Sequence, residues 1–234
     1  MVKAFASWSG GKDGCLAFYR AKQAGMDIRF LINMVSEDGE RSCSHGIRAV
    51  VIKNQAEAMG IPIVQKPTTS DTYETEFINT LKELKKKGVT AGIFGDIDFQ
   101  PHREWDEKVC GAIGITPYLP LWQEDQTKLM EEFIDAGFKS VVVAVKADLL
   151  GKEILGRIVD REFIKYLAGL NKKITPCGEA GEYHTLVIDG PIFQKRLEII
   201  KSEKVSRGEH HFLEILKINL TVKKRDGKYD KDNS

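Results

Sequence analysis

The sequence of 234 residues has few cysteines and no long apolar run. Its four cysteines stand far apart without a CxxC pair, so they do not form a disulfide framework. No apolar segment approaches the roughly 20 residues of a membrane helix. The stretch through Trp8 is too short, and too soon followed by Ser-Gly-Gly-Lys, for a signal peptide. We therefore expect a soluble, cytoplasmic protein.

An excess of charge of one sign is also absent. The 35 basic and 34 acidic residues leave a net charge of +1, so no overall field recruits DNA, RNA or an anionic membrane. Metal-ligand clusters are missing too. Cys43 and His45 alone do not complete a zinc site, and the adjacent His210 and His211 would face opposite sides of a strand. The oligomeric state stays open, a homo-oligomer included.

What the sequence does have is a regular alternation of apolar strand-like segments and helical patterns over its first half. This alternation predicts an α/β fold, an open parallel sheet with helices on both faces in a Rossmann-like arrangement. The expected strands span residues 2–8, 28–36, 61–67 and 89–97, and the expected helices span residues 14–24, 47–59, 72–87 and 102–113.

The pattern changes at residues 116–122, where two prolines interrupt it. Beyond them we expect a helix over 126–136, a strand over 138–147 and a helix containing Phe163 and Leu167. The segments 181–193 and 211–223 read as strands that pair with each other antiparallel. The predicted organisation is a first domain over 1–115, a smaller α+β domain over 116–224, and a polar, disordered tail over 225–234.

The joint between the first strand and the first helix reads SGGKDG, residues 9–14. Glycines let the backbone approach an anion, and a helix N-terminus points its N–H groups at it. The helix dipole contributes about 0.3–1 kcal/mol, whereas micromolar nucleotide binding requires about 8 kcal/mol. Lys12, several N–H groups and Mg²⁺ would supply the rest. An ordinary strand-to-helix turn is the alternative. Walker A and GxGxxG patterns are excluded, because Asp13 follows the lysine and the glycines are adjacent.

In this context the hexamer resembles the PP-loop, SGGxDS, of the N-type ATP pyrophosphatases, and the resemblance covers residues 2–113. It implies a HUP/PP-loop fold with ATP phosphates on the loop, Lys12 and Asp13 in catalysis, and Mg²⁺ on Asp13. Gly14 stands where the motif usually ends in serine, so a phosphate-binding hydroxyl is missing. The implied nucleotide contacts are Ser7, Trp8, Ser9, Gly10, Gly11, Lys12, Asp13, Gly14, Met34, His45, Gly95 and Asp96.

Several of these residues have a second interpretation. Trp8 is equally well explained as a packed aromatic side chain. Asp96 follows the fourth strand and could cap the next helix instead of contacting the nucleotide. His45 could simply lie at the entry of a helix. Arg103, beside His102, suits a phosphate or carboxylate but also an exposed helix face.

Three later stretches narrow the family. GDIDFQPHREWDEKVCGAIG, TPYLPLW and GEAGEYHTLVIDGPIF together resemble the diphthine–ammonia ligase family over residues 2–195, although His184 departs from the family's usual GExGEYETLVxDGPxF. The resemblance implies ATP-dependent amidation of diphthine on elongation factor 2 with ammonium, through an acyl-adenylate, with release of AMP and pyrophosphate. Arg103, Glu179, Glu182 and Tyr183 would receive the substrate, and Glu182 would act in catalysis. By composition alone, Glu179 and Glu182 read as solvated carboxylates of a polar turn.

Two other functions compete with amidation. A PP-loop tRNA thiolase would use the same adenylating chemistry, but it needs a nucleophilic cysteine and a basic RNA-binding surface. A non-catalytic sensor of ATP or AMP would need only the nucleotide site, and Gly14 keeps this alternative open. Pyrophosphate release separates the sensor from both enzymes.

Overall fold

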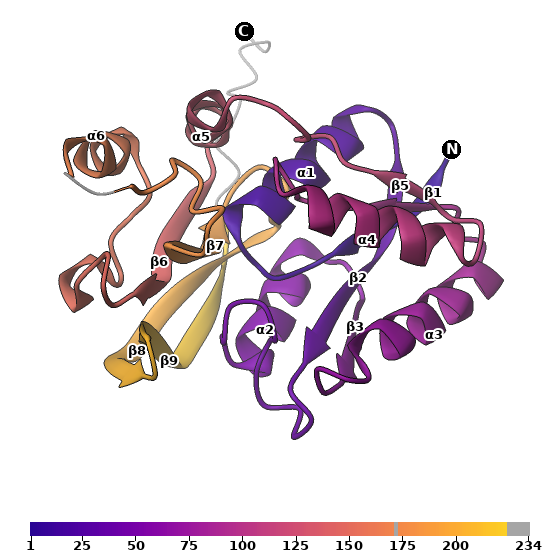
Figure 1. The fold of residues 1–234 in the computed structure, drawn as a ribbon, viewed down its shortest axis with the longest axis horizontal. Helices are drawn as coiled ribbons and strands as arrows, with labels where there is room; N and C mark the ends of the chain where they lie inside the picture. Colours follow the sequence, from indigo (N-terminus) through magenta and orange to yellow (C-terminus); the bar gives the residue numbers. More distant parts are fainter. Residues whose placement is uncertain (171–172, 224–234) are drawn as a thin grey trace, which may run out of the picture.

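Two sheets lie side by side in the computed structural model, which describes residues 1–170 and 173–223 (Figure 1). The first sheet is parallel and has the strand order β3-β2-β1-β4-β5. The predicted Rossmann-like α/β fold is thereby confirmed. Its strands are β1 (Lys3–Ser7), β2 (Asp27–Val35), β3 (Ile63–Pro67), β4 (Ala91–Ile93) and β5 (Thr116–Tyr118).

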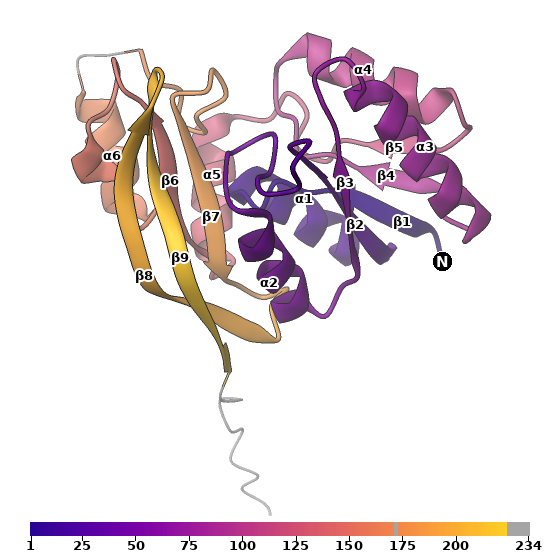
Figure 2. The same cartoon turned by 90° about the horizontal axis from the view of Figure 1, so that it is seen from below.

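Four helices cover the two faces of the parallel sheet: α1 (Lys12–Gln23), α2 (Ala49–Met59), α3 (Tyr73–Lys86) and α4 (Gln100–Gly111). Figure 2 shows α1 and α2 between the two sheets, and α3 and α4 on the outer face. The apolar spacing of α3 explains its position, because Phe77, Leu81 and Leu84 form one buried stripe against the sheet. No helix in the described residues is both long and apolar enough to span a membrane.

The second sheet is antiparallel, with the order β7-β6-β9-β8. Its strands are β6 (Lys139–Lys146), β7 (Tyr183–Asp189), β8 (Lys195–Arg207) and β9 (His210–Val222). The helices α5 (Gln126–Asp135) and α6 (Arg161–Gly169) and the 3₁₀ helix η1 (Lys152–Ile154) belong to the same half. Side chains of Asp125 and Asp160 cap the N-termini of α5 and α6.

The apolar core joins the two halves. One cluster combines Ala6 and Trp8 near the end of the parallel sheet with Leu16 of α1, Ile52 of α2 and Leu186 of β7. The face of the parallel sheet that carries α1 and α2 is therefore covered by the second sheet rather than by water. This packing sets the C-terminal end of β1 directly against β7.

Three strand predictions were wrong. β5 was missed, because Pro117 lies within it; proline is tolerated there because β5 is an edge strand. The segments around β7 and β9 do not pair with each other, since β6 lies between them and pairs with both. β8 was not predicted, because most of its residues beyond Ile199 are polar and exposed, so that the strand lacks an apolar alternation. The fourth strand is also shorter than expected, ending at Ile93. The predicted tail over 225–234 lies outside the described residues.

Candidate active site

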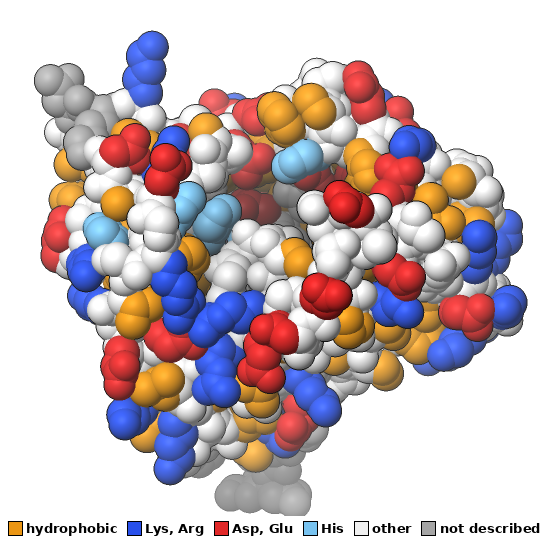
Figure 3. Space-filling view, turned by 60° about the horizontal axis from the view of Figure 1, so that its bottom comes forward, with side chains coloured by type: hydrophobic (Ala, Val, Ile, Leu, Met, Phe, Trp, Pro, Cys, Tyr) orange, Lys and Arg blue, Asp and Glu red, His pale blue; other side chains and the backbone are white. Residues whose placement is uncertain are grey.

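A cavity of about 460 Å³ opens where the carboxyl ends of β1, β2 and β4 meet β7. Figure 3 shows this face hollowed, with acidic side chains inside the hollow and histidines at its sides. A hollow of about 720 Å³ at the opposite end of the parallel strands lacks such a convergence of acids and histidines. The predicted residues that line the smaller cavity are Ser7, Trp8, Ser9, Lys12, Asp13, Gly14, Met34, His45, Gly95, Asp96, Glu179 and Tyr183.

The glycine loop (Ser9–Gly14) leads from β1 into α1 and packs tightly on the second sheet. Gly10 has φ of +85°, and its carbonyl accepts hydrogen bonds from Val187 N (3.0 Å) and Gln55 Nε2 (3.0 Å). A Cβ on Gly11 would stand 2.6 Å from Cε1 of His45. Both glycines are therefore required by close backbone packing, although neither lines the cavity.

Gly14 and Gly95 differ in what surrounds them. A Cβ on Gly95 would come within 2.7 Å of the Gly14 backbone nitrogen, so the segment after β4 must pass close to the start of α1. A Cβ on Gly14 would meet only the Ser7 carbonyl oxygen, at an ordinary 3.8 Å. The missing serine of the motif is thus not excluded by lack of space.

Lys12 is almost fully buried, and three groups hold its ammonium. Its Nζ donates to Asp13 Oδ2 (2.8 Å) and to the Cys177 carbonyl, and it lies 5.2 Å from the centre of the Tyr183 ring. Burial lowers the pKa of Lys12, but the charge and hydrogen bond of Asp13 together with Tyr183 and Cys177 outweigh burial, and the net pKa is raised. A fixed positive charge therefore lies at the N-terminus of α1, beside the cavity.

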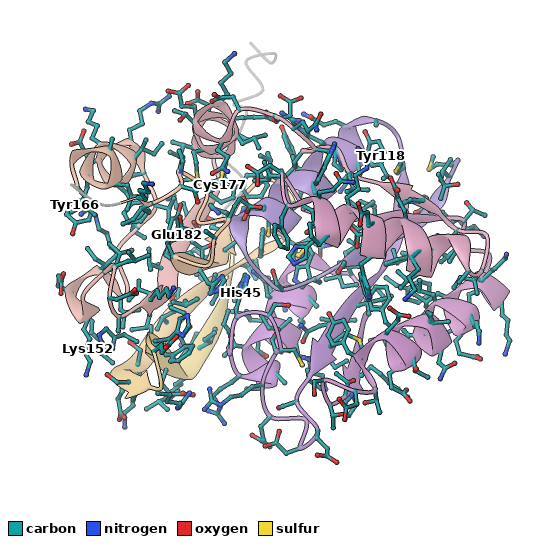
Figure 4. The ribbon with its side chains drawn as sticks, in the orientation of Figure 1. His45, Tyr118, Lys152, Tyr166, Cys177 and Glu182 are labelled. Carbon is teal, nitrogen blue, oxygen red and sulfur yellow. The ribbon has the colours of Figure 1, made fainter. Side chains whose placement is uncertain are left out.

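The second half contributes a loop, Thr175–Glu182, which we call the clamp loop. Glu182 is buried, and its carboxylate accepts from the backbone N–H groups of Thr175 (2.6 Å) and Ala180 (2.8 Å). Figure 4 shows Glu182 and Cys177 close together where the halves meet, with His45 nearby, whereas Lys152 and Tyr166 lie away on the second half. Glu182 does not line the cavity; its carboxylate shapes the loop that binds Lys12.

Glu179 projects from the clamp loop into the cavity. Burial, the charge of Asp13 and, more weakly, Asp98 and Asp96 raise the pKa of Glu179 to about 8, while Lys12 opposes them. Tyr183, which follows the clamp loop, is buried, and its hydroxyl donates to the Pro176 carbonyl. Of the two acids predicted in this stretch, only Glu179 is thus presented to a ligand.

Two histidines form one wall. The rings of His45 and His184 stack with centres 4.5 Å apart and planes inclined by 23°. Burial lowers the pKa of both, with His184 at about 4, and the nearby Lys12 adds to the effect. His45 Nδ1 is buried without a hydrogen-bond partner. Neutral imidazoles thus face the glycine loop, and one of them keeps a free ring nitrogen.

The opposite wall carries a histidine and an aspartate near the end of β4, and a second aspartate is buried close to them. His102 Nδ1 lies 2.9 Å from Asp96 Oδ1, and this hydrogen bond raises the pKa of His102. Asp106 of α4 is buried against Asp96, and burial raises its pKa to about 10. Asp106 is therefore a neutral acid at neutral pH. The neighbouring Asp96 adds to this rise in pKa, and Asp106 Oδ2 is buried without a hydrogen-bond partner.

Not every predicted contact is brought to the cavity. Arg103 lies outside the lining, donating to Glu107 (2.7 Å) and stacking over Trp122. Trp8 does line the cavity, but its side chain packs on Phe18 and donates to Gln55 (2.8 Å), which is the packed role given as its alternative.

Sequence reasoning did not assign Thr185, Cys177, Gly178, Gly181, Tyr73 or His184 to the lining. Their position within the GEAGEYHTLVIDGPIF stretch is a signal that could have found Gly178, Gly181, His184 and Thr185.

The lining suits a nucleotide with Mg²⁺. A helix N-terminus and a buried lysine face the cavity, and the close Gly95–Gly14 approach keeps side chains away from the backbone N–H groups. Among the described residues, no three Asp, Glu, His or Cys side chains gather closely enough to hold a metal ion alone. Mg²⁺ is usually bound by one or two carboxylates together with substrate phosphates, and Asp13 provides one carboxylate.

Known proteins resemble the chain in both halves. A family model of the diphthamide synthase N-terminal domain matches residues 2–117, and one of the C-terminal domain matches residues 125–221. A diphthine–ammonia ligase of Homo sapiens is 30% identical over 221 residues, which cover 84% of this chain and 82% of the relative. The chain belongs to the diphthine–ammonia ligase family.

Other members of the diphthine–ammonia ligase family align over similar lengths of the chain. The ligase of Rattus norvegicus is 29% identical and is covered to 88% of its length. That of Schizosaccharomyces pombe is 30% identical over 92% of this chain, but the match spans only 39% of that longer relative. The family is one of ligases, so the chain is an enzyme. Its two matched parts meet at the cavity, one supplying the glycine loop and the other the clamp loop.

Proposed function

We propose that the chain amidates diphthine on elongation factor 2, using ATP and ammonium and releasing AMP and pyrophosphate. The observation that carries this proposal is the glycine loop at the end of β1, with Lys12 and Asp13 lining a cavity closed by the second half. The names of the relatives point to the same reaction.

Amide formation from a carboxylate requires activation, because the carboxylate is a poor electrophile. Transfer of AMP from ATP gives an acyl-adenylate with a good leaving group. Lys12, fixed by Asp13 and the Cys177 carbonyl, would stabilise negative charge on the pyrophosphate as the bond breaks. Bound Mg²⁺, held by Asp13 and the phosphates, would share that charge. The N-terminus of α1 would orient the phosphates, and Ser7 and Met34 would border the base.

The clamp loop would receive the diphthine carboxylate. It lies opposite the glycine loop, it presents Glu179 to the cavity, and Glu182 fixes its backbone. Since Lys12 binds the Cys177 carbonyl, the loop and the phosphate site hold each other in place. In this proposal Glu182 acts by positioning the loop, whereas Glu179 faces the substrate.

The thiolase alternative is disfavoured by the state of the cysteines. Burial raises the pKa of Cys110 to about 12 and also raises the pKa values of Cys15, Cys43 and Cys177. The Cys177 thiol lies in the cavity wall but interacts with the Gln126 carbonyl (3.4 Å). A nucleophilic cysteine needs its thiolate form, and these surroundings favour the neutral thiol.

Pyrophosphate release tests the proposal. ATP and ammonium are supplied with and without diphthine-bearing elongation factor 2, and AMP is measured as the coproduct. We expect release only with the modified factor, and a loss of at least about 10²-fold in Lys12→Met. Lys22→Met, an exposed lysine of the same helix, is the matched control.

Two results would contradict the proposal. ATP binding without pyrophosphate release under any condition would indicate a non-catalytic nucleotide sensor. Pyrophosphate release that depends on tRNA, and that is lost in Cys177→Ser, would favour the tRNA thiolase alternative.

A further inference from the structure

Ammonium cannot attack a carbonyl carbon, because its nitrogen has no lone pair. At neutral pH almost all ammonia in water is ammonium, so a ligase that uses it must remove a proton close to the activated carboxyl group. The acceptor should lie at the cavity, reach solvent to pass the proton on, and have a third group that orients it.

His102 meets these geometric conditions. It lines the cavity from the start of α4, and its side chain is 64% exposed, so it lies at the mouth. Its Nδ1 is 2.9 Å from the Asp96 carboxylate, and next to an ionised carboxylate this nitrogen must be the donor. The Nε2 atom is then left with its lone pair free to accept a proton. Phe99 packs edge-on against the ring, with centres 4.8 Å apart, and limits its rotation.

We propose that His102, oriented by Asp96, takes the proton from ammonium at the mouth of the cavity. This inference rests on the proposed amidation and names a catalytic residue for it. The N–H bond of ammonium breaks with its electron pair staying on nitrogen, and the proton moves to Nε2. The nitrogen lone pair then forms the C–N bond, and the C–O bond to AMP breaks with its electrons on the phosphate. A second proton is lost from the nitrogen as the amide forms, and it leaves with AMP or goes to solvent.

The charges around His102 support this assignment. Two acids face it: Asp96 from the segment after β4, and Glu179 across the cavity from the clamp loop. The Asp96 carboxylate attracts a cation to the mouth, whereas Glu179, whose pKa is raised to about 8, is largely protonated at neutral pH. The neutral Asp106 is buried beside Asp96, the carboxylate that orients the imidazole.

The other bases of the cavity are less suitable. Burial lowers the pKa values of His45 and His184, so they would hold the proton weakly. Lys12 is kept protonated by Asp13. Glu179 faces Asp13 and Lys12, which places it beside the phosphate and substrate site. His102 alone among these groups combines access to solvent with an orienting carboxylate.

The choice of amine provides the test. Hydroxylamine is largely unprotonated at neutral pH and needs no base to become a nucleophile. We expect His102→Asn, whose amide can still donate to Asp96, to lose about 10²-fold in turnover with ammonium. Turnover with hydroxylamine should change by less than threefold, about the spread expected for a group outside the reaction. Substrate-dependent exchange between pyrophosphate and ATP, which reports activation alone, should be retained. His211→Asn, bonded to Ser206 away from the cavity, is the matched control.

Equal losses with both amines, or no loss with either, would overturn the role of His102. A second variant gives an independent readout. Asp96 raises the pKa of His102, so Asp96→Asn should move the rising limb of the pH profile for ammonium to lower pH. A limb that does not move would also overturn the proposal. If the wild-type protein shows no exchange with diphthine-bearing elongation factor 2, the proposed amidation fails before any amine is compared, and this inference falls with it.

Discussion

The backbone N–H of Lys12 donates a hydrogen bond of 3.0 Å to the hydroxyl of Thr185, although 173 residues separate them in the chain. The first backbone N–H groups of a helix have no hydrogen-bond partner within the helix. In α1, the N–H of Lys12 finds its partner on β7, a strand of the other sheet. The neighbouring bond from Val187 N to the Gly10 carbonyl continues this connection. The antiparallel sheet, through β7, thus holds the glycine loop, which belongs to the parallel sheet.

Thr185→Val should destabilise the protein by about 1–3 kcal/mol, because it leaves the buried Lys12 N–H without its partner. Denaturant unfolding measures the loss. The Thr90→Val variant removes an exposed hydroxyl with only a long bond of 3.4 Å and should change stability far less. Equal effects in the two variants would mean that the Thr185 bond contributes nothing particular.

Gly14→Ser should be tolerated and should tighten ATP binding. The added Cβ meets only an ordinary contact at 3.8 Å, serine is the better helix former by about 0.5 kcal/mol, and its hydroxyl would face the cavity. Gly95→Ser is the contrasting change, because its Cβ would collide with the Gly14 backbone at 2.7 Å. Calorimetric titration with ATP and thermal unfolding of both variants check this. A weaker ATP affinity in Gly14→Ser would show that the site is not arranged as in the common motif.

Glu182→Gln should lower stability by about 1–3 kcal/mol together with turnover. A glutamine amide would place an NH₂ group against one of the two backbone donors that Glu182 now accepts. Unfolding and pyrophosphate release are measured on the same sample, with the exposed Glu162→Gln as the control. If turnover fell while stability stayed unchanged, Glu182 would have a direct chemical role instead.

Stability should fall as the pH drops from about 6.5 to about 4, partly because of His184. Burial lowers the pKa of His184 from 6.5 to about 4 in the folded protein. In this window the unfolded chain binds a proton that the folded chain does not, so acid favours unfolding by up to about 1.4 kcal/mol per pH unit. The His184→Asn variant should show a shallower slope in denaturant unfolding at several pH values. Parallel slopes for the two proteins would contradict the buried neutral state.

Local signals in the sequence predicted the parallel sheet and the glycine loop. The SGGKDG stretch lies between a strand and a helix that neighbouring residues specify, so Lys12, Asp13 and the loop were found without knowledge of distant contacts. Gly95 and Asp96 followed from their position at the end of a strand. These residues share one edge because parallel strands end together.

The missed features depend on contacts between distant segments. Nothing near Thr185 indicates that its hydroxyl meets Lys12. The carboxylate of Glu182 was taken for a substrate ligand, because the two backbone groups it binds become neighbours only once the clamp loop is folded. The order of the second sheet was mistaken for a similar reason, since the central position of β6 is not visible in any one strand.

The burial of α1 and α2 between the two sheets makes the halves inseparable as modules. A fragment ending after β5 would expose an apolar face to water and would lose the Thr185 and Cys177 contacts to Lys12. Specificity for the proposed protein substrate could therefore not be exchanged by grafting a foreign second half. A replacement would have to reproduce the inner surface of β7 before it could present anything new at the cavity.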